Sequence, residues 1–225
     1  MVPWFSWSAA IFFVAGLYLG FFVAPTDVQQ GEAYRIMFIH VPASILSMFI
    51  YLVMAGYAAL GLIFNTRLSS MMASALAPTG ALLAFLSLWT GALWGKPMWG
   101  SWWVWDARLT SELILLFLYI GFIALHASIE DPRRADRASA LLAIIGSVNV
   151  PIIYFSVQWW NTLHQGATIK FTGTSMHEVM QQGLLAMLLA VWLYAIAMTL
   201  MRVRSIILER ECKTQWVAEL MEVKR

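Results

Sequence analysis

Residues 179–201 read VMQQGLLAMLLAVWLYAIAMTLM, an apolar run without a charged side chain. A helix needs about 20 such residues to cross the hydrocarbon core of a bilayer. Five similar runs precede it, and all are continuous rather than alternating, which disfavours membrane strands. The sequence therefore predicts an all-α, polytopic membrane protein with six transmembrane helices. We place them at Trp4–Ala24, Val41–Phe64, Met71–Leu93, Leu109–Ile129, Ala138–Gln158 and Val179–Met201.

The composition leaves room for one membrane domain, residues 1–225, and for no second globular domain. Hydrophobic residues make up 61% of the 225 residues, charged residues only 12%, and the mean hydropathy is +0.73. A soluble domain would carry about twice that share of charge. The net charge of +2 is too small to indicate nucleic-acid binding. The single cysteine, Cys212, excludes an internal disulfide and a C-x-x-C-H haem attachment.

The distribution of Lys and Arg predicts the orientation. Ten basic residues fall on the side that holds both termini, and four fall on the other side. The more basic side should be cytoplasmic. Residues 202–225 are then a cytoplasmic tail, expected to form a helix near the inner surface, and the loops at about 25–40, 94–108 and 159–178 face outward. No basic residue precedes the first apolar run, so we interpret it as a retained helix rather than a signal peptide.

Residues 94–106, WGKPMWGSWWVWD, lie in an expected outer loop, residues 94–110, and hold five of the twelve tryptophans. One or two interfacial tryptophans are explained as membrane anchors. Five indoles together can form a flat, apolar platform that suits a large planar ligand. A membrane belt or a partner contact remains an equal alternative. Met98 is the one methionine here that could bind a metal.

Three of the four histidines, His40, His164 and His177, fall on the predicted outer side, and His126 lies near the inner end of helix four. A lone interfacial histidine is most often a hydrogen-bonding residue. Two that flank a tryptophan platform suggest haem, whose iron takes axial imidazoles. An outer pair suits loading and handing on haem better than electron transfer across the bilayer. A b-type cytochrome or quinone-linked subunit, or a structural subunit of an export complex, remains an alternative.

The outer cations are candidate partners for the two haem propionates: Arg35, Lys96, Arg108 and Lys170. Arginine gives a bidentate fit to a carboxylate, which favours Arg35 and Arg108. Arg108 could instead pair with Asp106 or contact the start of helix four. Asp106 could contact the ligand or act as the N-cap of that helix. In helix five, Asn149-Val150-Pro151 predicts a kink, functional or ordinary.

Three motifs in order resemble a known family over almost the whole chain. Residues 99–110, WGSWWVWDARLT, resemble the tryptophan-rich WWD motif of haem-handling proteins. The histidine motifs His40-Val41-Pro42 and Trp159–Gln165, WWNTLHQ, flank it. Length, spans and motif order resemble the haem exporter protein C family of bacterial cytochrome c maturation.

The resemblance implies that the chain holds haem b transiently at the outer face of the bacterial inner membrane. His40 and His164 would be the axial ligands. The haem would pass to a periplasmic haem chaperone, and the implied partners are an ATP-binding cassette ATPase with its membrane subunits and a small single-span protein. The sequence has no phosphate-binding loop for ATP, so ATP use would belong to a partner. The chain would not itself be an enzyme. The motif would surround the haem with Trp99, Trp102, Trp103, Trp105, Asp106 and Arg108.

Overall fold

The computed structural model describes residues 1–164, 169–170, 173–174 and 176–222. It confirms the all-α class, with six helical segments that are long and apolar enough to span a bilayer and one pair of two-residue strands. The elements are α1 (Val2–Tyr18) with a π-helical end (Leu19–Val23), a 3-10 turn (Glu32–Ile36), α2 (Met37–Phe64), α3 (Arg67–Trp99), α4 (Ala107–Ser128), α5 (Pro132–Gly146), α6 (Asn149–Trp159), the two-residue strands β1 (Ile169–Lys170) and β2 (Gly173–Thr174), α7 (Glu178–Arg210) and α8 (Gln215–Glu222).

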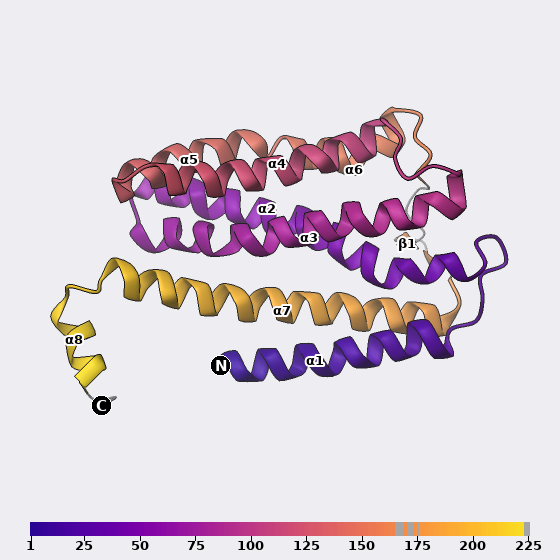
Figure 1. Cartoon of the computed structure of the whole chain (residues 1–225), viewed down its shortest axis with the longest axis horizontal. Coiled ribbons are helices and arrows are strands. Elements are labelled where there is room, and N and C mark those ends of the chain that lie inside the picture. Colours follow the sequence, from indigo (N-terminus) through magenta and orange to yellow (C-terminus); the bar gives the residue numbers. More distant parts are fainter. Residues whose placement is uncertain (165–168, 171–172, 175, 223–225) are drawn as a thin grey trace.

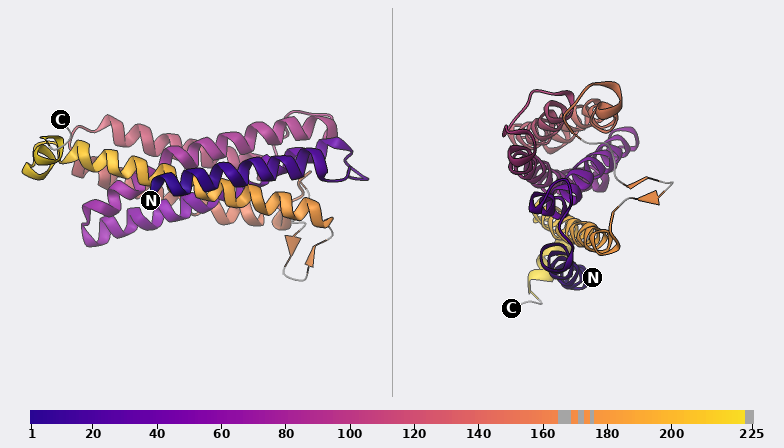
Figure 2. Two further views of the ribbon diagram at one scale, coloured as in Figure 1. Left: turned by 90° about the horizontal axis from the view of Figure 1, so that it is seen from below. Right: turned by 90° about the vertical axis from the view of Figure 1, so that its right-hand side faces the viewer.

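The spanning helices lie side by side along the long axis of the molecule (Figure 1). Helices α2 and α3 pack together along their lengths, as do α1 and α7, while α5 and α6 form the fifth span. One end carries residues 24–36, 100–106, 160–164 and 176–177, and we call it the long-loop end. The other, the short-turn end, carries the α2–α3 and α4–α5 turns and the step from α7 to α8 (Figures 1 and 2).

Small residues let the central helices approach closely. A Cβ atom on Gly80 of α3 would lie 2.1 Å from the ring of Tyr119 in α4, so only glycine fits there. The Tyr119 hydroxyl donates to the Ser47 carbonyl of α2 at 2.7 Å. Close approach through small residues, with a hydrogen bond between helices, is the usual way in which membrane helices pack. This core fixes α2, α3 and α4 relative to one another and therefore fixes the site between them.

Two predicted boundaries were wrong because charged and aromatic helical turns were assigned to loops. Residues 94–99 continue α3, which ends where Gly100 adopts φ +75° and its N–H bonds the Lys96 carbonyl at 3.0 Å. The expected 94–110 loop thus shrinks to residues 100–106. Helix α7 continues to Arg210, so the 202–225 tail begins inside it. Arg202 is accommodated there because it donates to Thr79 Oγ1 at 3.1 Å.

The fifth span breaks just before the predicted kink. Helix α5 ends at Gly146 and α6 begins at Asn149, with Pro151 in its first turn. A proline is tolerated there because its missing N–H would have had no helical partner. The Asn149 amide donates to the Ser111 carbonyl of α4 at 2.9 Å, which ties the break to the neighbouring helix.

Candidate functional site

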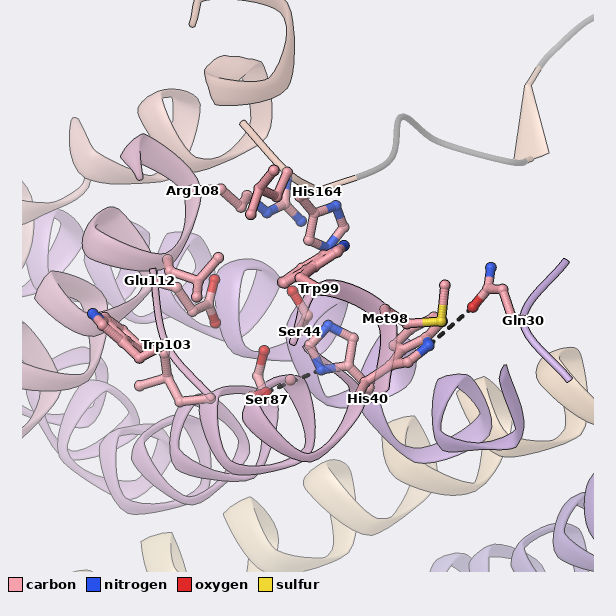
Figure 3. Close-up of a pocket in the computed structure, with 15 residues that line it drawn as sticks. Gln30, His40, Ser44, Ser87, Met98, Trp99, Trp103, Arg108, Glu112 and His164 are labelled. Atoms are coloured by element: carbon pink, nitrogen blue, oxygen red, sulfur yellow. Dashed lines mark hydrogen bonds between the residues drawn. The ribbon is translucent and has the colours of Figure 1, made fainter. Parts of the chain in front are cut away.

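A cavity opens at the long-loop end, between α2, α3, the start of α4 and the segment after α6 (Figure 3). Sites for small molecules and cofactors combine apolar walls with a few polar groups. This cavity has that character. Its lining consists of Gln30, His40, Ser44, Ser87, Leu88, Gly91, Trp94, Met98, Trp99, Trp103, Arg108, Leu109, Glu112, Leu163 and His164.

His40 projects from the start of α2 and is fixed by α3. Its Nδ1 lies 3.0 Å from the Ser87 carbonyl and 3.2 Å from Thr90 Oγ1. Because a carbonyl can only accept, Nδ1 carries the proton in the neutral ring, and Nε2 keeps the lone pair. The same arrangement orients metal-binding histidines in many proteins. His40 is therefore held in the tautomer that can bind a metal through Nε2.

His164 approaches the same space from the segment that follows α6 (Figure 3). Its ring centre lies 6.4 Å from that of His40, and the two planes differ by 34°. Two imidazoles that bind one metal ion from opposite sides, with bonds of about 2 Å, place their ring centres roughly 6 Å apart. The distance between the two rings is therefore compatible with one metal ion between them, and their role as ligands stays a prediction.

Three tryptophans line the cavity, and two predicted ones do not. Trp94 meets the His40 ring edge-on at 5.6 Å and donates its indole N–H to Gln30 Oε1 at 2.9 Å. The Trp99 ring lies 6.5 Å from that of His164. Trp103 completes the wall, and its indole Nε1 is buried without a partner among the described residues. Trp102 and Trp105 are 55% and 75% exposed and lie outside the lining.

Asp106 and Arg108 have different positions at the start of α4. Asp106 is the N-cap of the helix, because its Oδ1 accepts from the Leu109 N–H at 2.8 Å. It is not among the residues that line the cavity. Arg108 does line it and donates from Nη1 to the Ile153 carbonyl of α6 at 3.1 Å. This bond orients the guanidinium and replaces the contact with Asp106 that the sequence suggested.

The other candidate cations are engaged elsewhere or fall outside the description. Arg35 pairs with Glu32 and donates to the Gly20 carbonyl at 2.6 Å. Lys96 donates to the Gly100 carbonyl at 3.0 Å. The side chain of Lys170 lies outside the described residues. Of the candidate cations whose side chains the structure describes, Arg108 is the one that lines the cavity.

The two remaining histidines have structural partners. His177 caps α7 by accepting from the Val179 N–H at 3.3 Å. His126 lies at the short-turn end, where its Nε2 is 3.0 Å from Asp136 Oδ1. Asp136 also accepts two hydrogen bonds from Arg210, at 2.7 and 2.8 Å. Within residues 1–164 and 176–222, only His40 and His164 bring imidazoles into the cavity.

Sequence reasoning missed Glu112. This carboxyl is buried in the cavity wall, with Oε1 3.1 Å from the Ser47 hydroxyl and Oε2 without a partner among the described residues. It lies one helical turn beyond Arg108, on the same face of α4. An ionisable residue inside an apolar span is a functional candidate, because placing it in the membrane costs free energy. The position of Glu112 within the fourth apolar run could therefore have identified it.

The fold and the cavity define a multi-pass membrane protein that presents two imidazoles and a wall of indoles at one end of its helices. Comparison with known proteins agrees with this description. A family model described as heme exporter protein C matches residues 1–218. The chain belongs to the heme exporter protein C family, which confirms the resemblance seen in the motifs and makes it a transmembrane protein of haem transport in cytochrome c biogenesis.

Bacterial relatives named heme exporter protein C match over most of their length. The Escherichia coli K12 protein is 48% identical over 220 residues, which cover 98% of this chain and 89% of the relative. The Bradyrhizobium diazoefficiens protein is 44% identical over 227 residues, covering 100% and 84%. The Paracoccus denitrificans protein is 39% identical over 212 residues, covering 93% and 88%.

Proposed function

We propose that the chain binds haem b transiently at the outer face of the inner membrane and presents it to a periplasmic haem chaperone. The observation that carries this proposal is the pair of imidazoles, His40 and His164, whose ring centres lie 6.4 Å apart in one cavity. A carrier that moves electrons across the bilayer would need a second ligand pair at another depth. The described residues offer only His126 at the opposite end, and Asp136 holds it.

Each residue type has a separate role in this proposal. His40, through Nε2, and His164, through a ring nitrogen, would bind the haem iron. Trp99 and Trp103 cover the porphyrin with apolar surface. Arg108, already oriented by the Ile153 carbonyl, takes a propionate through its free N–H groups. Asp106 acts indirectly, because it fixes the start of α4 and so the position of Arg108.

The exposed indoles suit a role in transfer rather than in binding. Trp102 and Trp105 lie on the surface beside the cavity wall, and the Trp105 ring packs edge-on against Trp103 at 5.3 Å. Exposed tryptophans are typical centres of protein contacts. We assign them to the docking of the chaperone. The sequence of this chain has no ATP-binding motif, so ATP hydrolysis would come from an ATP-binding cassette ATPase. This ATPase would act in a complex with its membrane subunits, a small single-span protein and this chain.

The axial assignment is tested by the visible spectrum of the purified chain in detergent. His40→Ala or His164→Ala should lower the haem per protein roughly tenfold or more, since even second-sphere partners of metal ligands contribute 10- to 100-fold. The double variant should lose the Soret band. His177→Ser is the matched control, because it removes an imidazole at the same end while serine preserves the N-cap.

Normal haem content in the double histidine variant would show that the cavity does not bind haem through these rings.

Tryptophan variants purified in the same way separate haem binding from haem transfer. A Trp102→Ala/Trp105→Ala variant should retain its Soret band and load the chaperone poorly, whereas Trp103→Ala should lose haem itself. If the Trp102→Ala/Trp105→Ala variant lost as much haem as Trp103→Ala, the exposed indoles would belong to the haem-binding site.

A further inference from the structure

A second, polar pocket lies at the short-turn end, far along the helices from the cavity. It lies between the α2–α3 turn and the first turns of α5. We call it the arginine pocket. Its lining consists of Gly61, Leu62, Asn65, Thr66, Arg67, Ser70, Arg133, Asp136 and Arg137.

The three arginines of this pocket carry uncompensated charge. Arg67 begins α3, while Arg133 and Arg137 lie one turn apart on α5. Within the described part of the chain, none of their guanidinium groups makes a hydrogen bond or an ion pair. The one acid in the lining, Asp136, is already paired with Arg210 and His126.

The backbone adds to the same positive field. Thr66 is the N-cap of α3 but makes no side-chain cap, so the first amides of the helix lack that partner. A helix N-terminus attracts anions through these amides and its dipole. Guanidinium groups are the donors best matched to phosphate oxygens. Three arginines and a helix start around one hollow therefore point to a phosphate group.

The surroundings of the pocket indicate where that phosphate comes from. Ile63 and Phe64 continue α2 beside the pocket and are 70% and 66% exposed, and Leu68 on the first turn of α3 is 58% exposed. A soluble anion would gain nothing from these side chains. A phospholipid would place its headgroup among the arginines and its acyl chains along them, as in the basic headgroup pockets at the ends of membrane helices.

We propose that the arginine pocket binds the phosphate headgroup of an anionic phospholipid. On the basis of the charge asymmetry, this lipid belongs to the cytoplasmic leaflet. The site is independent of haem transfer and anchors the α2–α3 and α4–α5 turns to that leaflet. Each arginine near a membrane surface contributes roughly a fivefold gain in affinity for anionic lipid.

The test titrates the purified full chain in detergent with phosphatidylglycerol and, in parallel, with phosphatidylcholine, and reads bound lipid by native mass spectrometry. The wild type should prefer phosphatidylglycerol. An Arg67→Gln/Arg133→Gln/Arg137→Gln variant should lose that preference by roughly fivefold for each arginine removed. An Arg134→Gln/Arg204→Gln/Lys213→Gln variant is the matched control, because it removes the same charge at the same end from residues outside the lining.

Three results would overturn the proposal. Equal loss in both triple variants would show a diffuse surface charge rather than a site. Equal thermal stabilisation of the wild type by inorganic phosphate and by phosphatidylglycerol would show a soluble-anion site. No preference for phosphatidylglycerol in the wild type would show that the pocket does not select anionic lipid, and an acidic protein partner would then be the better candidate. The last two tests use unmodified protein, so the proposal stays testable if a triple variant does not fold.

Discussion

His40 is oriented by a group that no side-chain substitution removes, because its strongest partner is the backbone carbonyl of Ser87. Thr90 adds only a second, longer contact, and its hydroxyl already donates to the Leu86 carbonyl at 2.6 Å. The position of the ring instead depends on the space beside it. A Cβ atom on Gly91 would lie 3.0 Å from His40 Cε1, tighter than ordinary van der Waals contact.

We therefore expect Gly91→Val to lower haem content severalfold by displacing the His40 ring from its hydrogen bond. The same substitution at Gly56 is the control, since a Cβ there meets nothing within 4 Å. Soret absorbance per protein measures the effect, and circular dichroism should show unchanged helix content in both variants. Full haem content in Gly91→Val would mean that the ring position is not limiting.

At the scale of single elements, two caps hold the short segment that carries the motif. Gly100 ends α3 in a left-handed conformation, and Asp106 begins α4 with its carboxylate. Between them, the Ser101 hydroxyl donates to the Trp103 carbonyl at 2.7 Å. Because the two helix ends are fixed, the orientation of Trp103 between them is fixed as well.

Gly100→Ala tests whether the two helix caps hold the segment between α3 and α4. A non-glycine residue in the left-handed region costs roughly 1–2 kcal/mol, and relief of that strain would unwind the end of α3 that carries Trp99. We expect a lower unfolding temperature together with a blue-shifted or weakened Soret band. Asn65→Ala is the control, because it places alanine at φ 52° at the opposite end. It should lower the unfolding temperature and leave the spectrum unchanged.

The elements also show what the sequence could predict. Continuous apolar runs located all six spans, because bilayer thickness alone sets their length. The predicted C-terminal ends of α3 and α7 were too early, because the last turns of these helices hydrogen-bond to other elements. Trp94 bonds to Gln30 and Arg210 bonds to Asp136. Likewise, the two histidines were predicted to share a side. Which tryptophans face them depends on the rotation of α3 for Trp94 and Trp99, and on the path of the 100–106 segment for the other three, and no local pattern predicts that path.

For the whole molecule, the two proposed sites lie at opposite ends of the same helices. The long-loop end holds the cavity with its histidines, and the short-turn end holds the arginine pocket and the Asp136 cluster. The arrangement gives the chain a polarity that matches its charge asymmetry, with ten basic residues assigned to one side and four to the other. From the positive-inside rule we therefore expect the cavity to face the periplasm.

The single native cysteine makes this orientation directly measurable. Cys212 is exposed beyond α7 at the short-turn end, and Val28 is fully exposed at the long-loop end. In spheroplasts, a membrane-impermeant maleimide should label Val28→Cys in a Cys212→Ser background and should leave native Cys212 unlabelled. Inside-out vesicles should give the reverse, and Cys212→Ser alone should be unlabelled in both. Labelling of Cys212 in intact spheroplasts would show that the cavity faces the cytoplasm, where its haem could not reach a periplasmic acceptor.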